Sequence, residues 1–228
     1  MQRTGAATIK RPAEVDRMRA AGAILADILD VLRAELRPGV TTADLDATAA
    51  RMMADAGAIS SFKGYGSNPP FPAVICTSLN DEVVHGIPSP RRRIADGDVV
   101  SVDIGCIVDG WHADCARTWI VGEVPVEVAD LVDATRGGME AGIAAAQPGN
   151  RLGDIGHAIE AFANERGYGI VRPFVGHGIG RSMHEDPQVP NYGRPGTGMV
   201  IEPGMCFAIE PMFNLGGDGV FVDDDGWT

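Results

Sequence analysis

Two aspartates on either side of a short turn are well suited to bind a metal ion. Asp103 and Asp114 lie in apolar segments joined by Asp109-Gly110, a dipeptide typical of tight hairpin turns. Because strand side chains alternate, a two-residue turn would place both aspartates on the same face of the hairpin as diagonal neighbours. Like charges this close are destabilising unless a cation binds between them. The pair therefore predicts a metal site, although one aspartate alone is more typical of an exposed strand end.

Three groups further along the chain could complete such a site. His177 stands among the glycines of Gly176 to Gly180, His184 precedes Glu185-Asp186-Pro187, and Glu210 ends an apolar segment. An unpaired buried carboxylate is costly, so Glu210 needs either a metal or an arginine as its partner. Oxygen ligands suit hard divalent cations, and imidazole admits transition metals. If these segments converge with the two aspartates, they match the ligand set of a two-metal hydrolase.

His85 is a further imidazole, at the end of a strand-like segment and the start of a turn. Any one of His85, His177 and His184 taken singly would more often be a hydrogen-bonded core residue than a functional one. Their interest comes from occurring together with the carboxylates.

The elements that must position these residues follow from hydrophobic periodicity. Apolar spacing and turn residues predict helices and strands in the order helix, helix, strands, and then the same order again. Thr41 resembles a helix N-cap, with Asp44 one residue off the ideal capping box. This order predicts an α+β fold with a pseudo-duplicated plan and one domain over residues 1–228. We expect helices at 12–36, 41–55, 125–146 and 152–166, strands at 73–78, 98–107, 111–121, 170–175, 198–201 and 205–210, a hairpin at 213–222 and a surface loop at 64–72.

Composition narrows the class of protein. The chain has 228 residues, with 31 acidic and 19 basic side chains and a net charge of −12. This charge argues against nucleic acid or an anionic membrane as the main partner, and it is compatible with a cationic peptide N-terminus. No segment approaches the roughly 20 apolar residues of a membrane span, and residues 1–11 lack the apolar core of a signal peptide. We therefore expect a cytoplasmic protein whose four cysteines, which have no C-x-x-C spacing, are buried thiols.

Several motifs together resemble type I methionine aminopeptidases, which have the pita-bread metallopeptidase fold. The resemblance covers nearly the whole chain from Ile9 onward and implies an antiparallel sheet covered by helices with pseudo-two-fold symmetry. The interval from His177 to Glu210 leaves no room for the helical insertion of the type II enzymes. The matching stretches are NDEVVHGIP at 80–88, VDIGCIVDGWHADCART at 102–118, GHGIGRSMHEDP at 176–187, PNY at 190–192, AIEPMF at 208–213 and GWT at 226–228.

The resemblance implies two divalent metal cations, drawn from Co, Mn, Fe and Zn. It makes Asp103 a ligand of one metal, Asp114 a ligand of both, and His177 and Glu210 ligands of the second. In the family a fifth ligand, a glutamate, lies on a final strand beyond the position of Thr228. We therefore expect this sequence to be a fragment without the C-terminal strand, to bind one cation weakly and to turn over poorly.

The resemblance also implies catalytic and substrate-binding roles. His184 matches the imidazole that meets the scissile carbonyl, His85 matches the one at the first peptide unit of the substrate, and Glu210 could carry a proton to the amide nitrogen. An apolar wall would accept the methionine side chain, although ordinary packing is nearly as good an explanation for each of its members. These members are Tyr65, Phe71, Cys76, Met183 and Trp227.

The implied activity is removal of the initiator methionine from nascent polypeptides through a metal-activated water. The expected partner is the nascent N-terminus, with the ribosome as a further candidate, and the expected oligomeric state is a monomer. Two alternatives remain open. One is an aminopeptidase of the Xaa-Pro type on the same fold, and the other is a catalytically impaired pita-bread module that serves as a binding protein.

Overall fold

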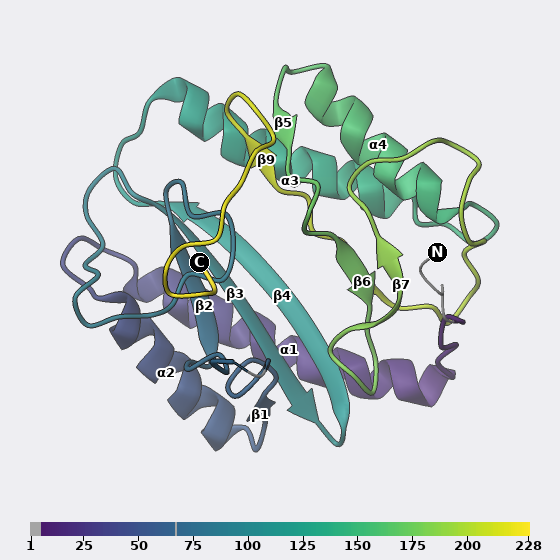
Figure 1. The fold of residues 1–228 in the computed structure, drawn as a ribbon. Helices are drawn as coiled ribbons and strands as arrows, with labels where there is room; N and C mark the ends of the chain where they lie inside the picture. Colours follow the sequence, from purple (N-terminus) through teal and green to yellow (C-terminus); the bar gives the residue numbers. More distant parts are fainter. Residues whose placement is uncertain (1–5, 67) are drawn as a thin grey trace. The chain divides into compact units, whose positions relative to one another are not determined.

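The computed structural model describes residues 6–66 and 68–228, and the chain divides into two compact units. Residues 13–124 and 221–228 form the hairpin unit. Residues 6–12 and 125–220 belong to the small-sheet unit. The two contain helices and antiparallel strands, so the predicted α+β class is confirmed (Figure 1). The interpretation of residues 1–228 as one catalytic domain stays a prediction, and residues 1–5 lie outside the described residues.

The hairpin unit contains a four-stranded antiparallel sheet. β3 pairs with β4 along its whole length, and β1 and β2 pair with other parts of β3. The predicted helices and the three longer strands are confirmed to within about two residues, whereas the short β1 was not predicted. The elements are α1 (Pro12–Glu35), α2 (Thr42–Asp55), β1 (Ile59–Ser60), β2 (Ile75–Leu79), β3 (Val99–Val108) and β4 (Trp111–Ile120).

The register of the β3–β4 hairpin is the one that the sequence predicts. Val108 lies opposite Trp111 across the turn, Asp103 opposite Ala116 and Gly105 opposite Asp114. Because residues two apart share a face, Asp103 and Asp114 lie on the same face of the sheet.

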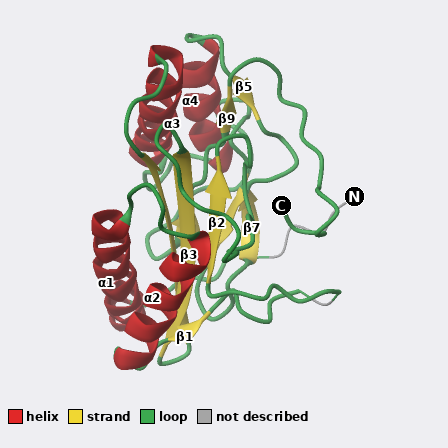
Figure 2. Cartoon of the chain, turned by 90° about the vertical axis from the view of Figure 1, so that its left-hand side faces the viewer, coloured by secondary structure: helices red, strands yellow, loops and turns green. Residues whose placement is uncertain are grey.

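The other face of this sheet packs against α1 and α2 (Figure 2). Four residues of β3, spaced two apart, are fully buried and join one hydrophobic core with the apolar sides of both helices. The alternation along β3 therefore turns its polar residues away from this core. The buried hydrophobic residues of β3 are Val100, Val102, Ile104 and Cys106.

The start of α2 corrects one prediction. Thr41 accepts a hydrogen bond from the amide of Asp44, and the Asp44 carboxylate accepts one from the amide of Thr41. The capping box is thus complete, and the expected offset of one residue was wrong. Thr41 is the N-cap itself, which makes Asp44 the third helical residue, where the acid of a capping box belongs.

The small-sheet unit has two helices and only short strands. β6 is the centre of a three-stranded sheet between β7 and β8, and β5 pairs with β9. Its core is separate from that of the hairpin unit and includes Ile155, Ile159, Val189 and Phe213. The elements are α3 (Val126–Ala145), α4 (Leu152–Asn164), β5 (Gly169–Ile170), β6 (Gly176–Gly178), β7 (Glu185–Val189), β8 (Phe207–Ala208) and β9 (Phe213–Asn214).

Both predicted helices of this unit are confirmed, but several predicted strands are not. Residues 170–175 contribute only the end of β5, and residues 198–201 form only an isolated bridge between Arg151 and Val200. The predicted hairpin at 213–222 is wrong, because β9 pairs with β5 instead. Glycines at 216, 217 and 219 supply no side chains to pack a second strand there. β7, which contains a proline, was not predicted.

None of the described helices is long and apolar enough to cross a membrane. All four cysteines are free, with Cys76 and Cys106 buried and Cys115 and Cys206 half-buried. Burial raises the pKa of Cys106 to about 11, so that this thiol stays protonated and unreactive.

Candidate metal-binding and catalytic residues

The two aspartates of the hairpin lie on the sheet face turned away from the core. Asp103 and Asp114 are both half-buried, and Cys76 of β2 lies directly opposite Asp103. Burial raises the pKa of the Cys76 thiol well above its usual value, and the nearby charges of Asp103 and Asp114 raise it further. The hairpin unit therefore concentrates negative charge at one position, which a bound cation would neutralise.

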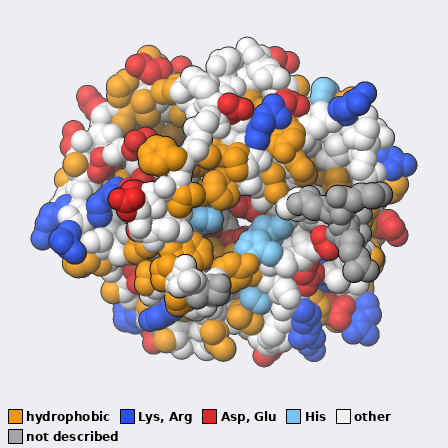
Figure 3. All heavy atoms as spheres, viewed as in Figure 1, with side chains coloured by type: hydrophobic (Ala, Val, Ile, Leu, Met, Phe, Trp, Pro, Cys, Tyr) orange, Lys and Arg blue, Asp and Glu red, His pale blue; other side chains and the backbone are white. Residues whose placement is uncertain are grey.

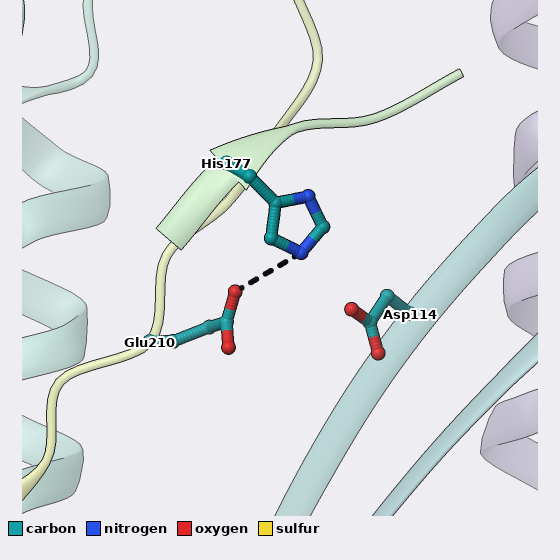
Figure 4. Close-up of side chains that lie close together, drawn as sticks. All are labelled: Asp114, His177 and Glu210. Atoms are coloured by element: carbon teal, nitrogen blue, oxygen red, sulfur yellow. Dashed lines mark ion pairs between the residues drawn. The ribbon is translucent and has the colours of Figure 1, made fainter. Parts of the chain in front are cut away.

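In the small-sheet unit, the backbone fixes one ring nitrogen of His177. Nδ1 of this buried side chain lies 2.9 Å from the carbonyl oxygen of Gly178. Because a carbonyl oxygen can only accept, Nδ1 donates its hydrogen, and Nε2 of the neutral ring keeps the lone pair. Nε2 lies 3.3 Å from Oε1 of Glu210 (Figure 4).

The His177–Glu210 pair has the chemistry of a metal site. With a neutral ring, Nε2 and Oε1 are both acceptors, so they repel each other unless a proton or a cation lies between them. An imidazole nitrogen and a carboxylate oxygen are both ligands for divalent transition metals. A backbone carbonyl that orients the other ring nitrogen is usual for metal-binding histidines. Figure 4 also draws Asp114 on β4, which offers a carboxylate oxygen of the same kind.

The glycines around His177 allow the neighbouring strands to come close. A Cβ atom on Gly176 would lie 2.2 Å from the carbonyl oxygen of Ala208, and one on Gly178 would lie 2.4 Å from that of Asp186. Side chains at these positions would push β8 and β7 away from β6. The glycine-rich segment is therefore explained by close packing on both sides of the strand that carries His177.

Asn191 holds the backbone of Glu210, a role that sequence reasoning missed. Asn191 is fully buried, and its Nδ2 donates to the carbonyl oxygen of Glu210 over 2.7 Å. Buried amides almost always have such partners. The residue was noted in the PNY stretch, but only its burial, which the sequence does not reveal, indicates what it does.

His184 lies next to His177 in the same unit. The two ring centroids are 4.2 Å apart and the rings are tilted by 57°. His184 is exposed whereas His177 is buried, and histidine side chains reach the face drawn in Figure 3. The exposed imidazole is accessible to a substrate, whereas the buried one is shielded from water.

His85, in the hairpin unit, has a left-handed backbone conformation with φ of 61°. The next residue fixes this conformation, because the amide of Gly86 donates to Oγ of Ser78 and its carbonyl accepts from Thr77. A non-glycine residue with positive φ is uncommon and often marks a functional position. Burial lowers the pKa of His85, and a hydrogen bond to the backbone of Trp227 partly offsets that shift.

Part of the predicted methionine pocket is a cluster of aromatic rings in the hairpin unit. The Trp227 ring contacts Phe71, with centroids 5.2 Å apart, and His85, with centroids 5.9 Å apart. Trp227 Nε1 donates to the carbonyl oxygen of Pro69 over 3.1 Å, which fixes the ring. Tyr65 is 44% exposed in the neighbouring loop.

The other predicted pocket residues belong to other elements of the chain. Cys76 is buried on β2 beside Asp103, and Met183 is buried in the small-sheet unit next to His184 in the sequence. The assignment of these residues and of the aromatic cluster to a methionine pocket stays a prediction, as do the individual roles of the metal-binding and catalytic residues.

Comparison with known proteins extends over nearly the whole chain. The sequence model of metallopeptidase family M24 matches residues 16–227. A methionine aminopeptidase of Clostridium acetobutylicum is 49% identical over 220 residues, which are 96% of this chain and 87% of that protein. The crystal structure of a methionine aminopeptidase from Thermotoga maritima has a TM-score of 0.94 and 41% identity, and the match covers 97% of this chain and 88% of the other.

A more distant match concerns the fold alone. The prolidase of Pyrococcus horikoshii has a TM-score of 0.77 at 24% identity, over 89% of this chain and 55% of that chain. Aminopeptidases and prolidases of this kind share the pita-bread fold, so the fold expected from the sequence motifs is confirmed.

Proposed function

We propose, from the premise that the chain belongs to metallopeptidase family M24, that it is a methionine aminopeptidase that removes the initiator methionine from nascent polypeptides in the cytoplasm. Relatives of this name are 40–49% identical over most of the chain. The observation that carries the proposal is a pair of atoms of metal-ligand type, Nε2 of His177 and Oε1 of Glu210, 3.3 Å apart.

The ligands that we propose for divalent cations are the carboxylates of Asp103, Asp114 and Glu210 and the imidazole of His177. The charge concentrated at the hairpin and the fixed tautomer of His177 both support this assignment. We propose cations from the series Co, Mn, Fe and Zn, because a mixed nitrogen and oxygen ligand set admits each of these metals.

Divalent cations at such a site supply Lewis acidity, which polarises a peptide carbonyl and lowers the pKa of water. The protein's own groups would orient the substrate around this centre. The exposed imidazole of His184 can donate a hydrogen bond to the scissile carbonyl oxygen as negative charge develops there. His85 is held by its neighbours on β2, and its lowered pKa keeps it neutral near pH 7, where it can accept or donate a hydrogen bond at the first peptide unit.

The proposed specificity comes from apolar side chains. Phe71 and Trp227 form a fixed aromatic surface in the hairpin unit, and a thioether packs favourably against aromatic rings. Tyr65, Cys76 and Met183 would complete the pocket. The net charge of −12 also favours a substrate that carries a positive N-terminus.

Release of methionine from the peptide Met-Ala-Ser tests the proposal. The chain is incubated with Mn²⁺ or Co²⁺, and free methionine is measured with and without a chelator. We expect release that requires the metal and that is abolished in His85→Ala and His177→Ala. Arg136→Met, which removes an exposed ion pair with Asp133 on α3, is the control that should retain activity.

The same assay distinguishes the proposed function from the two alternatives. Cleavage of an Ala-Pro peptide without release from Met-Ala-Ser would make the chain a proline-directed enzyme. Binding of the peptide without cleavage, with each of Mn, Co, Fe and Zn, would make it a binding module. The relatives' names favour neither. We expect a monomer, because all the assigned residues belong to one chain. Cosedimentation with ribosomes would test whether the ribosome is a further partner.

A further inference from the structure

Glu185, the residue after His184, organises the loop that carries that histidine. Its Oε1 accepts hydrogen bonds from the backbone amides of Arg181 (2.7 Å) and Ser182 (3.1 Å). A single carboxylate oxygen thus ties two residues of the 180–184 loop to the start of β7. In the sequence, His184 lies between the two residues that donate these amides and Glu185. The segment that carries His184 is therefore held at both ends.

The second oxygen of Glu185 is held by residues from the start of the chain. Oε2 accepts from Nζ of Lys10 over 2.9 Å and from the hydroxyl of Thr8. Nζ of Lys10 also donates to Oγ1 of Thr8 over 2.5 Å. Glu185 therefore links two segments that are 175 positions apart in the sequence.

Lys10 is itself fixed by close packing. Its backbone amide donates to the carbonyl oxygen of Gly204 over 2.8 Å, and a Cβ atom on Gly180 would lie 2.5 Å from its Cε atom. The side chain of Lys10 is only 3% exposed and that of Glu185 only 11%. The aliphatic part of Lys10 therefore fills the space beside Gly180, while the ammonium group neutralises the carboxylate.

The electrostatics agree with a permanently ionised Glu185. Burial acts to raise its pKa, but the hydrogen bonds from Thr8, Lys10 and Ser182 outweigh burial and hold the pKa at about 2. Loss of the lysine would leave a buried carboxylate without its counter-ion, and this is costly enough for the carboxylate to turn toward water. The two amides of the loop would then lose their acceptor.

We propose that Lys10 is a positioning residue for His184, acting through Glu185 and the 180–184 loop. The part of this inference that concerns catalysis rests on the proposed function, in which His184 meets the scissile carbonyl. The part that concerns the loop rests only on the contacts within the small-sheet unit. Lys10 would give the loop one conformation before a substrate arrives, so that His184 does not have to be ordered during the reaction.

Hydrogen exchange of the loop tests the structural part without any need for activity. In Lys10→Met we expect the amides of Arg181 and Ser182 to exchange at least about tenfold faster, the effect of losing one hydrogen bond to a charged group. Thr8→Val, which removes a single donor and keeps the lysine, should give a smaller increase. Arg136→Met should leave this exchange unchanged. Unchanged exchange in folded Lys10→Met would overturn the proposal, and if that variant does not fold, unchanged exchange in Thr8→Val would do so.

A double-mutant cycle tests the catalytic part. Misplacement of His184 by about 1 Å could lower kcat roughly 100-fold, and KM should change little because the lost interaction belongs to the transition state. In a His184→Ala background, Lys10→Met should then lower kcat no further. A merely structural lysine would lower kcat by the same factor in both backgrounds, and this outcome would overturn the proposal. If the unaltered chain releases no methionine, the proposed function fails, while the exchange experiment still decides the role of Lys10.

Discussion

The hairpin unit and the small-sheet unit hold their polar groups in different ways. In the hairpin unit, Asp103 and Asp114 sit on two strands of ten residues each, which pair without a break from Val99–Ile120 to Val108–Trp111. In the small-sheet unit, the strand of His177 has three residues, and its register with β7 shifts directly after His177. A regular ladder of backbone hydrogen bonds positions the two aspartates, whereas individual contacts position His177, His184 and Glu210.

This difference indicates where each unit is sensitive to substitution. Many backbone hydrogen bonds determine the ladder, so replacing one side chain on its polar face should leave the strands in place. The irregular sheet depends on close glycine contacts and on single buried hydrogen bonds from Asn191 and Lys10. Substitutions at these positions should therefore lower the free energy of unfolding more than substitutions of the aspartates.

The largest effect should follow from Gly176→Ala in β6. The new Cβ would lie 2.2 Å from the carbonyl oxygen of Ala208, a backbone atom that cannot move alone. We expect a loss of about 3 kcal/mol in the free energy of unfolding, measured by urea denaturation. Gly217→Ala, at a glycine of the same unit with open space around its Cβ position, is the matched control. Equal stability of the two variants would contradict the close packing of β6 and β8.

Asn191→Ala should have the next largest effect. It removes the buried amide that donates to the half-buried carbonyl oxygen of Glu210. The expected cost is about 2 kcal/mol, and the affinity for Mn²⁺, measured by calorimetric titration, should fall as Glu210 loses its fixed backbone. An unchanged affinity in a folded variant would show that Asn191 does not position Glu210.

The helix cap of the hairpin unit should contribute less. Thr41→Ala removes the acceptor for the amide of Asp44, at an expected cost of about 1 kcal/mol in thermal or urea unfolding. Thr41→Ser keeps the hydroxyl and should retain most of the stability. If both substitutions cost the same, the methyl group of the threonine, rather than the cap, stabilises α2.

Asp114→Asn should stabilise the fold slightly, in contrast to the substitutions above. With a chelator present, removal of one of two like charges on the same sheet face should raise the free energy of unfolding by about 0.5 kcal/mol. Binding of Mn²⁺ should nevertheless be weakened strongly. Asp109→Asn, at the turn of the same hairpin, removes the same charge and should leave the affinity for Mn²⁺ unchanged. A destabilised Asp114→Asn in the presence of chelator would argue against mutual repulsion of the aspartates.

The smallest effect should be a pH dependence from His85. Burial lowers its folded-state pKa below the usual value of 6.5, so the unfolded chain takes up the proton more readily than the folded one. The contribution of His85 to the free energy of unfolding is therefore fully present above pH 6.5, and it is lost as the pH decreases toward the folded-state pKa. The difference in unfolding free energy between the unaltered chain and His85→Gln should show this slope between pH 8 and 5. A slope of the opposite sign would mean that the folded state favours the charged ring.

The same contrast explains which predictions from the sequence succeeded. The Asp109-Gly110 turn and the alternation of β3 are local signals, so the register and the shared face of Asp103 and Asp114 could be predicted. Residues 198–201 have a strand-like pattern, yet only Val200 forms a bridge, because the segment that hydrogen-bonds with them, residues 149–153, turns into α4 at Leu152. Conversely, β7 forms around a proline because β6 lies next to it.

The sequence alone determined which side chains are available for metal binding and how the β3–β4 hairpin pairs, because both depend on residue type and on spacings of two residues. Tertiary structure decided which nitrogen of His177 keeps its lone pair, what holds the backbone of Glu210, and that Lys10 neutralises Glu185. Each of these depends on a hydrogen bond or a buried charge pair whose geometry no local pattern encodes, and in the case of Lys10 and Glu185 the partners are 175 positions apart.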